Sequence, residues 1–135
     1  MPEKSNRELV QDFFAAVAAG ELPDGLLTPD MTAWTTTQGA MTKAAYQNAI
    51  RLLARMCAQP LAFTIDAITS EDDRTVAELR STGTLVNGEP YANTYVFVFR
   101  LRDGRITSVA EHYNALIVQE KMIPLMRALA GGSTS

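Results

Sequence analysis

The sequence predicts a single α+β domain in which helices pack on a curved antiparallel sheet and enclose an apolar pocket. Three observations support this fold class. Two stretches of the first half carry apolar residues at helical spacing, the second half holds four strand-like runs joined by short turns, and 47% of the 135 residues are hydrophobic. We place the domain at residues 1–130 and expect residues 131–135 to form a frayed tail.

The helical segments are marked by capping residues and apolar stripes. Ser5 followed by Glu8 is a capping-box pattern, and Gly20 ends the same segment. Thr42 is a suitable N-cap for a second long helix, which Pro60 closes. The expected helices are Ser5–Ala19, a short one over Leu22–Leu27, Thr42–Cys57, and Ala115–Ala130, which Pro124 interrupts or restarts.

The strand-like runs predict an antiparallel meander that follows one earlier strand. The earlier strand, Met31–Thr37, is rich in threonine and holds the only tryptophan, Trp34. The meander strands are Leu61–Thr69, Thr75–Val86, Tyr91–Arg102 and Ile106–Asn114. They are separated by turn residues at 71–73, 87–88 and 103–104.

The Asp103-Gly104 turn predicts the register of the last two strands. A two-residue hairpin turn pairs Arg102 with Arg105 and fixes every pair behind them. The predicted inward-facing pairs are Leu101 with Ile106, Phe99 with Ser108, Phe97 with Ala110, Tyr95 with His112, and Asn93 with Asn114. One end of this otherwise apolar face is therefore expected to carry four polar side chains.

This polar cluster is the candidate site. An apolar cavity with a few converging polar groups is typical of a ligand pocket, whereas the alternative is a hydrogen-bonded cluster at a wet sheet edge. A lone histidine is more often structural, but His112 in this setting is the candidate general acid–base, with Tyr95 as a hydrogen-bond donor. The expected ligand-lining residues are Asn93, Trp34, Phe13, Tyr46, Phe63, Phe97 and Phe99.

The opposite face of the sheet mixes valines with charges. A three-residue loop at 87–89 turns Glu78 and Arg80 outward, and we prefer it because it avoids burying two charges. A four-residue loop makes Glu78 a pocket carboxylate instead. The residues expected outward on the last two strands are Arg100, Val98, Val96, Thr107, Val109, Glu111 and Tyr113. This face is too apolar for water, so we expect it to pair with a second subunit as a homodimer.

Several sequence stretches resemble the NTF2-like (cystatin-like) superfamily, and within it SnoaL-like and ketosteroid-isomerase-related proteins. They are the runs 83–91 (GTLVNGEPY), 93–100 (NTYVFVFR), 102–106 (RDGRI) and 111–114 (EHYN). The resemblance implies a cone with a hydrophobic pocket, often dimeric. In polyketide cyclases of this type a pocket Asp near the end of the last strand moves the proton, and here Asn114 stands at that position. An amide cannot take a proton, although it can orient a carbonyl or an enolate.

The function expected from these features is proton transfer on an apolar, polyketide- or steroid-like carbonyl compound by isomerisation, cyclisation or dehydration. His112 then moves the proton, while Tyr95 and Asn114 hold the oxygen. The replacement of the acidic residue leaves two alternatives open: a ligand-binding or accessory protein without chemistry, and a dimerisation module with a vestigial pocket.

The composition argues against several other classes of function. One histidine and one cysteine fall short of a metal-ligand set, and we expect no cofactor. The net charge of −3 argues against a nucleic-acid partner. The sequence shows no apolar run of membrane-spanning length, and a cytoplasmic location is expected.

Overall fold

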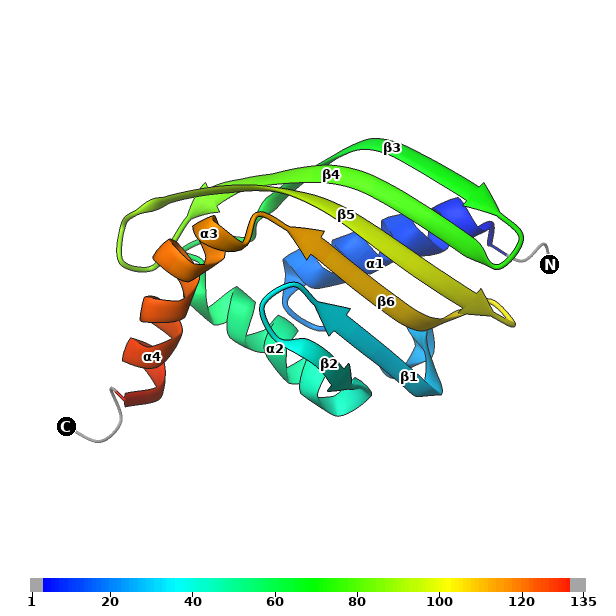
Figure 1. The fold of residues 1–135 in the computed structure, drawn as a ribbon, viewed down its shortest axis with the longest axis horizontal. Helices are drawn as coiled ribbons and strands as arrows, with labels where there is room; N and C mark the ends of the chain where they lie inside the picture. Colours follow the sequence, from blue (N-terminus) through cyan, green and yellow to red (C-terminus); the bar gives the residue numbers. More distant parts are fainter. Residues whose placement is uncertain (1–3, 132–135) are drawn as a thin grey trace.

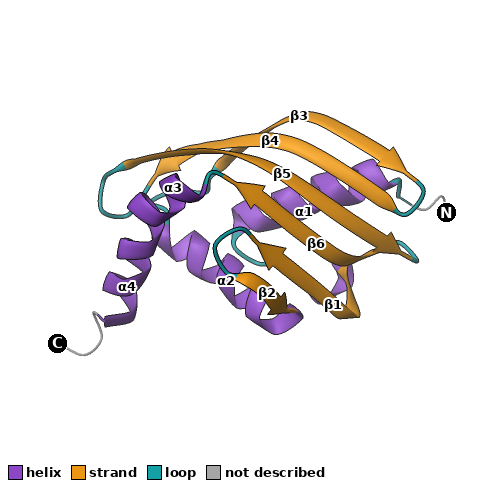
Figure 2. Ribbon diagram, in the orientation of Figure 1, coloured by secondary structure: helices purple, strands orange, loops and turns teal. Residues whose placement is uncertain are grey.

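The protein forms one curved six-stranded sheet with its two long helices on a single face (Figures 1 and 2). The structure is a computed structural model and describes residues 4–131. The elements are α1 (Asn6–Ala19), the 3₁₀ turn η1 (Asp24–Leu26), β1 (Leu27–Thr35), β2 (Gly39–Thr42), α2 (Lys43–Met56), β3 (Ala62–Glu71), β4 (Arg74–Thr84), β5 (Pro90–Arg102), β6 (Arg105–Tyr113), α3 (Ala115–Ile117), the π-helical turn η2 (Val118–Met122) and α4 (Ile123–Gly131). The strands lie in the order β2-β1-β6-β5-β4-β3. The predicted α+β fold class and the meander from β3 to β6 are confirmed.

The predicted helix caps are confirmed. Ser5 and Glu8 form the full capping box of α1, and the Thr42 side chain accepts a hydrogen bond from the backbone of Ala45 at the start of α2. The C-terminal segment is helical as predicted. Its π-helical turn ends two residues before Pro124, whose ring nitrogen cannot donate to the preceding turn of an α-helix.

The first strand differs from the prediction at both ends. β1 begins at Leu27, so the short helix expected over Leu22–Leu27 shrinks to the turn η1, and the strand ends at Thr35. A tight turn then leads into β2, which the sequence analysis missed because four residues carry too little pattern. The turn places residues 36–38 beside β6, where Thr36 donates its backbone N–H to the carbonyl of Glu111.

A β-bulge at Thr107 changes the predicted register of β6. The Asp103-Gly104 turn pairs Arg102 with Arg105, as predicted, and both turn residues have positive φ. Two residues further on, the ladder shifts because Leu101 pairs with Ile106 while Arg100 pairs with Ser108, which leaves Thr107 without a partner on β5. The expected pairs of Phe99 with Ser108, Phe97 with Ala110, Tyr95 with His112, and Asn93 with Asn114 are therefore wrong.

The bulge exchanges the two faces of β6 beyond it. Val109, Glu111 and Tyr113 turn to the inner face, and Ser108, Ala110 and His112 turn outward. The earlier strand keeps the predicted orientation, because Ala77 and Leu79 are buried while Glu78 is exposed. Its pairing with β5 is displaced by two residues from the predicted one, which preserves the faces.

The core lies between the sheet and the two long helices. Phe13 and Phe14 of α1 pack edge-on against Phe99 and Phe97 of β5, with ring centroids 5.0 and 4.9 Å apart. A second cluster joins the end of α2 to the C-terminal helix through Met56, Leu85, Met122 and Leu125. This second cluster holds the C-terminal helix beside the end of α2 (Figure 1).

Three further expectations from the sequence concern the C-terminal tail, membrane-spanning helices and the location in the cell. Gly131 ends α4, and the rest of the expected tail, residues 132–135, lies outside the described residues. Within residues 4–131 the structure has no helix that combines the length and apolar character needed to cross a membrane. The cytoplasmic location stays a prediction.

Gly20 connects α1 to the sheet at a position that excludes a side chain. Its φ is +83°, and a Cβ built there lies 2.6 Å from the Cβ of Ala54. We expect Gly20→Ala to lower the free energy of unfolding by about 1–3 kcal/mol, because backbone strain and the contact with α2 add. Urea denaturation measures the change. Gly25→Ala is the matched control, since no atom lies within 4 Å of a Cβ there. Equal effects of the two substitutions would contradict the explanation.

Candidate active site

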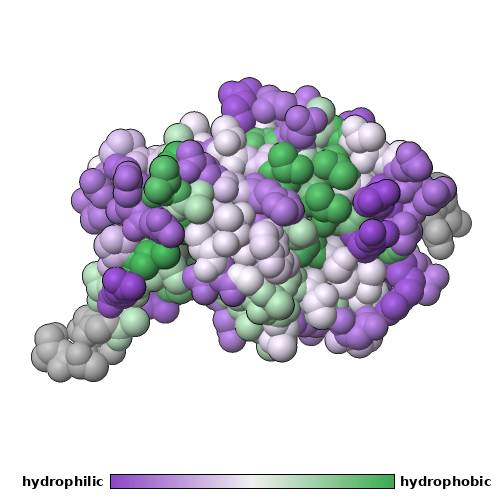
Figure 3. Space-filling model, in the orientation of Figure 1, coloured by the Kyte–Doolittle hydropathy of each residue, from purple (hydrophilic) through white to green (hydrophobic). Residues whose placement is uncertain are grey.

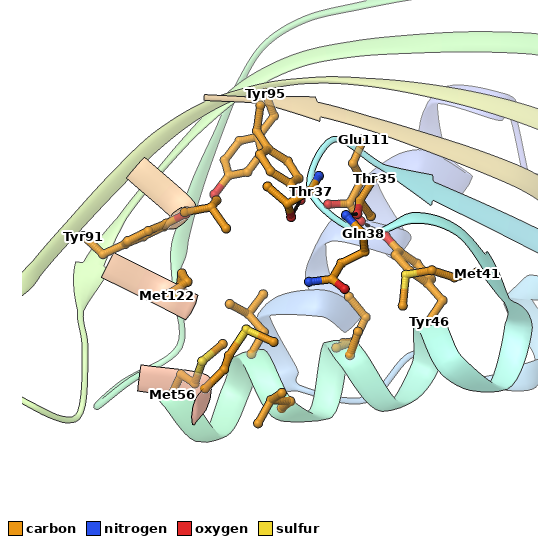
Figure 4. Close-up of a pocket in the computed structure, with 17 residues that line it drawn as sticks. Thr35, Thr37, Gln38, Met41, Tyr46, Met56, Tyr91, Tyr95, Glu111 and Met122 are labelled. Atoms are coloured by element: carbon orange, nitrogen blue, oxygen red, sulfur yellow. Dashed lines mark hydrogen bonds between the residues drawn. The ribbon is translucent and has the colours of Figure 1, made fainter. Parts of the chain in front are cut away.

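A cavity of about 140 Å³ lies between the inner face of the sheet, α2 and the C-terminal helix (Figure 4). Its lining draws on two residue types above all. All four tyrosines of the chain and four of its six methionines contribute: Tyr46, Tyr91, Tyr95, Tyr113, Met41, Met56, Met122 and Met126. The lining residues also include one carboxylate, Glu111, and no Lys, Arg or His. The site is thus apolar and aromatic, with a single ionisable acid.

Glu111 lies at the inner side of β6, near the wall formed by β1 and α2. Its carboxylate accepts a hydrogen bond from the phenol of Tyr46, which is buried. Burial raises the pKa of Glu111 from 4.5 to about 7, and the Tyr46 hydrogen bond offsets part of that rise. A carboxyl group with such a pKa exchanges its proton near neutral pH, as a general acid–base requires.

Tyr46 acts on Glu111 as a fixed donor. Burial and the charge of Glu111 raise the pKa of the Tyr46 phenol well above 10.0, so the phenol stays protonated. The ring packs parallel to Phe13 with centroids 6.4 Å apart, which holds it in place. The donated hydrogen bond therefore stabilises the charged carboxylate and orients one of its oxygens.

The turn between β1 and β2 closes the site beside Glu111. The hydroxyl of Tyr113 lies 2.5 Å from the Thr37 hydroxyl and accepts the backbone N–H of Thr37. The neighbouring Gln38 backbone donates to the Thr35 hydroxyl over 3.0 Å. Figure 4 shows the Gln38 side-chain amide directed into the cavity, where it can donate to a ligand oxygen.

A second polar group of the cavity is formed by Tyr91 and Tyr95 of β5. The hydroxyl of Tyr95 lies 2.7 Å from that of Ser81, and the hydroxyl of Tyr91 accepts a hydrogen bond of 3.1 Å from the Asn93 amide. Burial raises the pKa of both phenols. Both tyrosines are therefore neutral hydrogen-bonding groups at physiological pH.

The structure places His112 and Asn114 away from the cavity, contrary to the prediction. His112 is exposed on the outer face of the sheet, where its ring lies 5.0 Å from that of Trp34. Asn114 is exposed and caps α3, because its side chain accepts the backbone N–H of Leu116 over 3.1 Å. The cause is the bulge at Thr107, which reverses the orientation of β6 beyond it.

The predicted lining residues divide into three groups. Tyr46 and Tyr95 line the cavity as expected. Phe13, Phe97 and Phe99 are buried in the core, Phe63 packs against that core, and Asn93 is buried behind Tyr91, so none of these five belongs to the lining. Trp34 lies on the outer face and is 39% exposed.

Sequence reasoning missed Glu111, whose role rests on the bulge. It also placed this residue on the outer face, which carries the charged residues Glu78, Arg80 and Arg100. The two arginines instead contact Asp66 and Asp73, over 2.9 and 3.7 Å. One signal was present: Ile106 and Val109 are apolar residues three apart, which fits a strand with one face buried only if an extra residue lies between them.

The described residues offer no metal site. Within 4–131 no group of three or more His, Cys, Asp or Glu side chains is arranged to hold a metal ion. The single cysteine, Cys57, is buried, and burial raises the pKa of its thiol, which makes it a poor nucleophile. Glu111 is thus the group of the cavity suited to proton transfer.

The curved sheet with both long helices on one face has the NTF2-like fold. The chain belongs to the family of SnoaL-like domains, whose family model matches residues 10–109. No curated protein sequence matches it significantly.

Solved structures show the same fold at low sequence identity. One is a provisionally assigned isomerase from Bacillus subtilis, with a TM-score of 0.74 and 23% identity over 85% of this chain and 90% of that chain. Another is wild-type IdmH from Streptomyces antibioticus, provisionally assigned as a polyketide cyclase, with a TM-score of 0.75 and 14% identity over 88% and 99% of the two chains. A Catenulispora acidiphila protein with a ketosteroid isomerase-like fold, in complex with trimethylamine, gives a TM-score of 0.74 and 20% identity over 90% and 97%.

The raised pKa of Glu111 makes folding stability depend on pH. Between about pH 4.5 and 7 the folded chain holds a proton at this site that the unfolded chain has released, so the free energy of unfolding falls as pH rises through this window. Glu111→Gln removes the effect. We expect the stability of this variant relative to wild type to rise by roughly 3 kcal/mol between pH 4.5 and 8.

Urea denaturation at several pH values measures this difference. Glu78→Gln is the matched control, because Glu78 is exposed on the outer face. Its stability relative to wild type is expected to stay constant across the same window. A Glu111→Gln difference that does not change with pH would show that the carboxyl is not destabilised by burial.

Proposed function

We propose that the protein is an enzyme that moves a proton on a small, mostly apolar carbonyl compound, with Glu111 as the acid–base. The observation that carries the proposal is the carboxyl group itself: it faces an apolar cavity, its pKa is about 7, and a buried phenol holds it in one orientation. Purely structural interiors rarely keep an ionisable carboxyl without a cationic partner.

The chemistry that fits this arrangement is a carbon-to-carbon proton shift. The Glu111 carboxylate takes a proton from the carbon next to a carbonyl, and the electron pair of the broken C–H bond moves onto the carbonyl oxygen as an enolate. The protonated Glu111 then returns the proton to another carbon of the conjugated system, and the electrons move back from the oxygen. Isomerisation needs no further reagent, and cyclisation or dehydration can begin with the same first step.

The enolate oxygen needs a hydrogen-bond donor within the cavity. The sequence suggested Tyr95, but its hydroxyl lies 2.7 Å from that of Ser81, on the side of the cavity that Tyr91 also lines. The Gln38 amide is the candidate that fits, since it points into the cavity beside Glu111 (Figure 4). Asn114 is not, because its side chain caps α3.

Glu111→Gln tests this role. We expect the variant to lose at least about 100-fold in kcat/KM, because an amide cannot take a proton, while ligand binding persists. A suitable probe is the conversion of β,γ-cyclohexenone to its conjugated isomer, followed by ultraviolet absorbance. For the wild type, kcat/KM should rise with pH and level off above about pH 7, since the base must be deprotonated.

His112→Ala is the matched control, and its kcat/KM is expected to equal that of the wild type because the His112 side chain lies on the face of the sheet opposite the cavity. Unchanged turnover in Glu111→Gln would remove Glu111 as the acid–base. Binding of ketones by the wild type without proton exchange in D₂O would favour the second candidate, a ligand-binding protein without chemistry.

We also propose that the outer face of the sheet pairs with a second copy of the chain. Trp34 and Val96 are each 39% exposed there, and the partly exposed Val76, Val98 and Ala110 lie on the same face. Figure 3 shows an apolar area over these strands with polar residues around it. Exposed large apolar side chains gathered on one sheet face are typical of a protein–protein contact.

Val96→Glu tests the homodimer. A charge in the centre of this face is expected to shift the wild-type dimer to a monomer, as measured by light scattering coupled to size-exclusion chromatography. Gln59→Glu adds the same charge at an exposed position after α2 and should leave the dimer intact. A monomeric wild type at micromolar concentration would contradict the proposal.

A further inference from the structure

The size of the cavity limits what it can hold. Its volume of about 140 Å³ is close to that of an engineered protein cavity of about 150 Å³ that binds benzene, and well below the roughly 300–1,000 Å³ of pockets for drug-sized ligands. A six-membered ring fills such a space, and a fused ring system does not. We propose that the substrate is a neutral, single-ring carbonyl compound that carries a second oxygen on the side of the ring opposite the carbonyl. This inference rests on the proposed function of Glu111.

Helices border the cavity on two sides. On one side, α2 contributes Leu52 and Leu53. On the other side, the C-terminal helix contributes Met122 and Met126. This helix is held by the buried side chains of Met122 and Leu125 and by an ion pair of 3.6 Å between Lys121 of η2 and Glu89 of the β4–β5 loop. These contacts hold the C-terminal helix beside the cavity and limit the width of the space next to α2.

Methionines allow local adjustment within that width. Met41, Met56, Met122 and Met126 have unbranched side chains with several rotatable bonds, so they can fit around substituents on a ring. A further fused ring is rigid and adds more volume than one side-chain rotation can release. The lining therefore predicts tolerance for methyl or hydroxyl substituents and exclusion of a second ring.

Polar groups of the lining lie at two ends of the cavity. Glu111, Thr35 and Gln38 lie together at one end of the cavity, whereas Tyr91 and Tyr95 reach into it from β5 at the other end (Figure 4). A carbonyl with an acidic neighbouring C–H fits the first set. The phenols of the second set can donate to, or accept from, a hydroxyl or a second carbonyl across the ring.

The charge of the lining selects neutral ligands. The residues that line the cavity include no Lys, Arg or His, and Glu111 adds a negative charge once it releases its proton. A carboxylate or phosphate on the ligand would thus be desolvated without a cationic partner and repelled by Glu111. Substrates attached to an anionic carrier group inside the cavity are excluded on the same ground.

Calorimetric titration of the Glu111→Gln variant, which cannot turn over ligand, tests the inference. The probes are cyclohexanone, 4-hydroxycyclohexanone, the two-ring ketone 2-decalone and the steroid androstenedione. Burial of more apolar surface ordinarily tightens binding, so a size limit reverses the usual order. We expect 4-hydroxycyclohexanone to bind at least about fivefold more tightly than cyclohexanone, and both larger ketones to bind at least about tenfold more weakly.

Two variants in the same Glu111→Gln background locate the effects. Met126→Ala enlarges the cavity and should improve 2-decalone binding at least about fivefold, while Tyr91→Phe with Tyr95→Phe should remove the advantage of the hydroxyl group. The anion 4-oxocyclohexanecarboxylate should bind more weakly than 4-hydroxycyclohexanone in wild type and variant alike.

The outcomes separate the inference from the proposed function. Binding of androstenedione or 2-decalone as tight as that of the single-ring ketones overturns the size limit, even if Glu111 proves essential for turnover. Equal binding of cyclohexanone and 4-hydroxycyclohexanone overturns the inference that the substrate carries a second oxygen. Conversely, full activity of Glu111→Gln would exclude Glu111 as the acid–base. A measured preference for single-ring ketones would even then support the inference about which ligands the cavity binds.

Discussion

The candidate active site of this protein depends on one extra residue in β6. Thr107 has no partner on β5, and its hydroxyl accepts a hydrogen bond of 3.1 Å from Thr28 of the neighbouring strand. Because side chains alternate along a strand, the bulge turns every later residue of β6 to the face opposite the one a regular ladder would give. Glu111 faces the cavity as a result, and His112 faces outward. The position of Glu111 thus depends on the backbone pairing at Thr107, four residues earlier on β6.

The buried carboxyl is the second determinant of the site, and it follows from the first. Once Glu111 faces the interior, loss of hydration raises its pKa, and the hydrogen bond from Tyr46 limits that rise. The two effects leave the group near neutrality, where it can both accept and return a proton. Tyr46 comes from α2, so the packing of α2 against the sheet sets the chemistry of a residue on β6. The proposed acid–base role of Glu111 therefore depends on this contact between α2 and β6.

Cavity shape and cavity chemistry come from different parts of the chain. The sheet supplies the polar groups, with the tyrosines of β5 and β6 and the residues of the β1–β2 turn. The helices supply the apolar limits through leucines and methionines. The local outcome in this chain is a cavity of about 140 Å³ with polar groups at two ends and no Lys, Arg or His in its lining. The proposed ligand class rests on these three features together.

The sequence by itself determined the fold class, the capping of both long helices, the four-stranded meander, the outward position of Glu78, and the inclusion of Tyr46 and Tyr95 in the pocket. Each of these follows from local signals: capping residues, apolar periodicity and turn chemistry. The facing of His112, Asn114 and Glu111 was decided only in the tertiary structure. A strand records its faces by strict alternation, and a bulge breaks that alternation at a point fixed by pairing with two neighbouring strands. The identity of the acid, its pKa and the volume in front of it therefore come from contacts between distant segments.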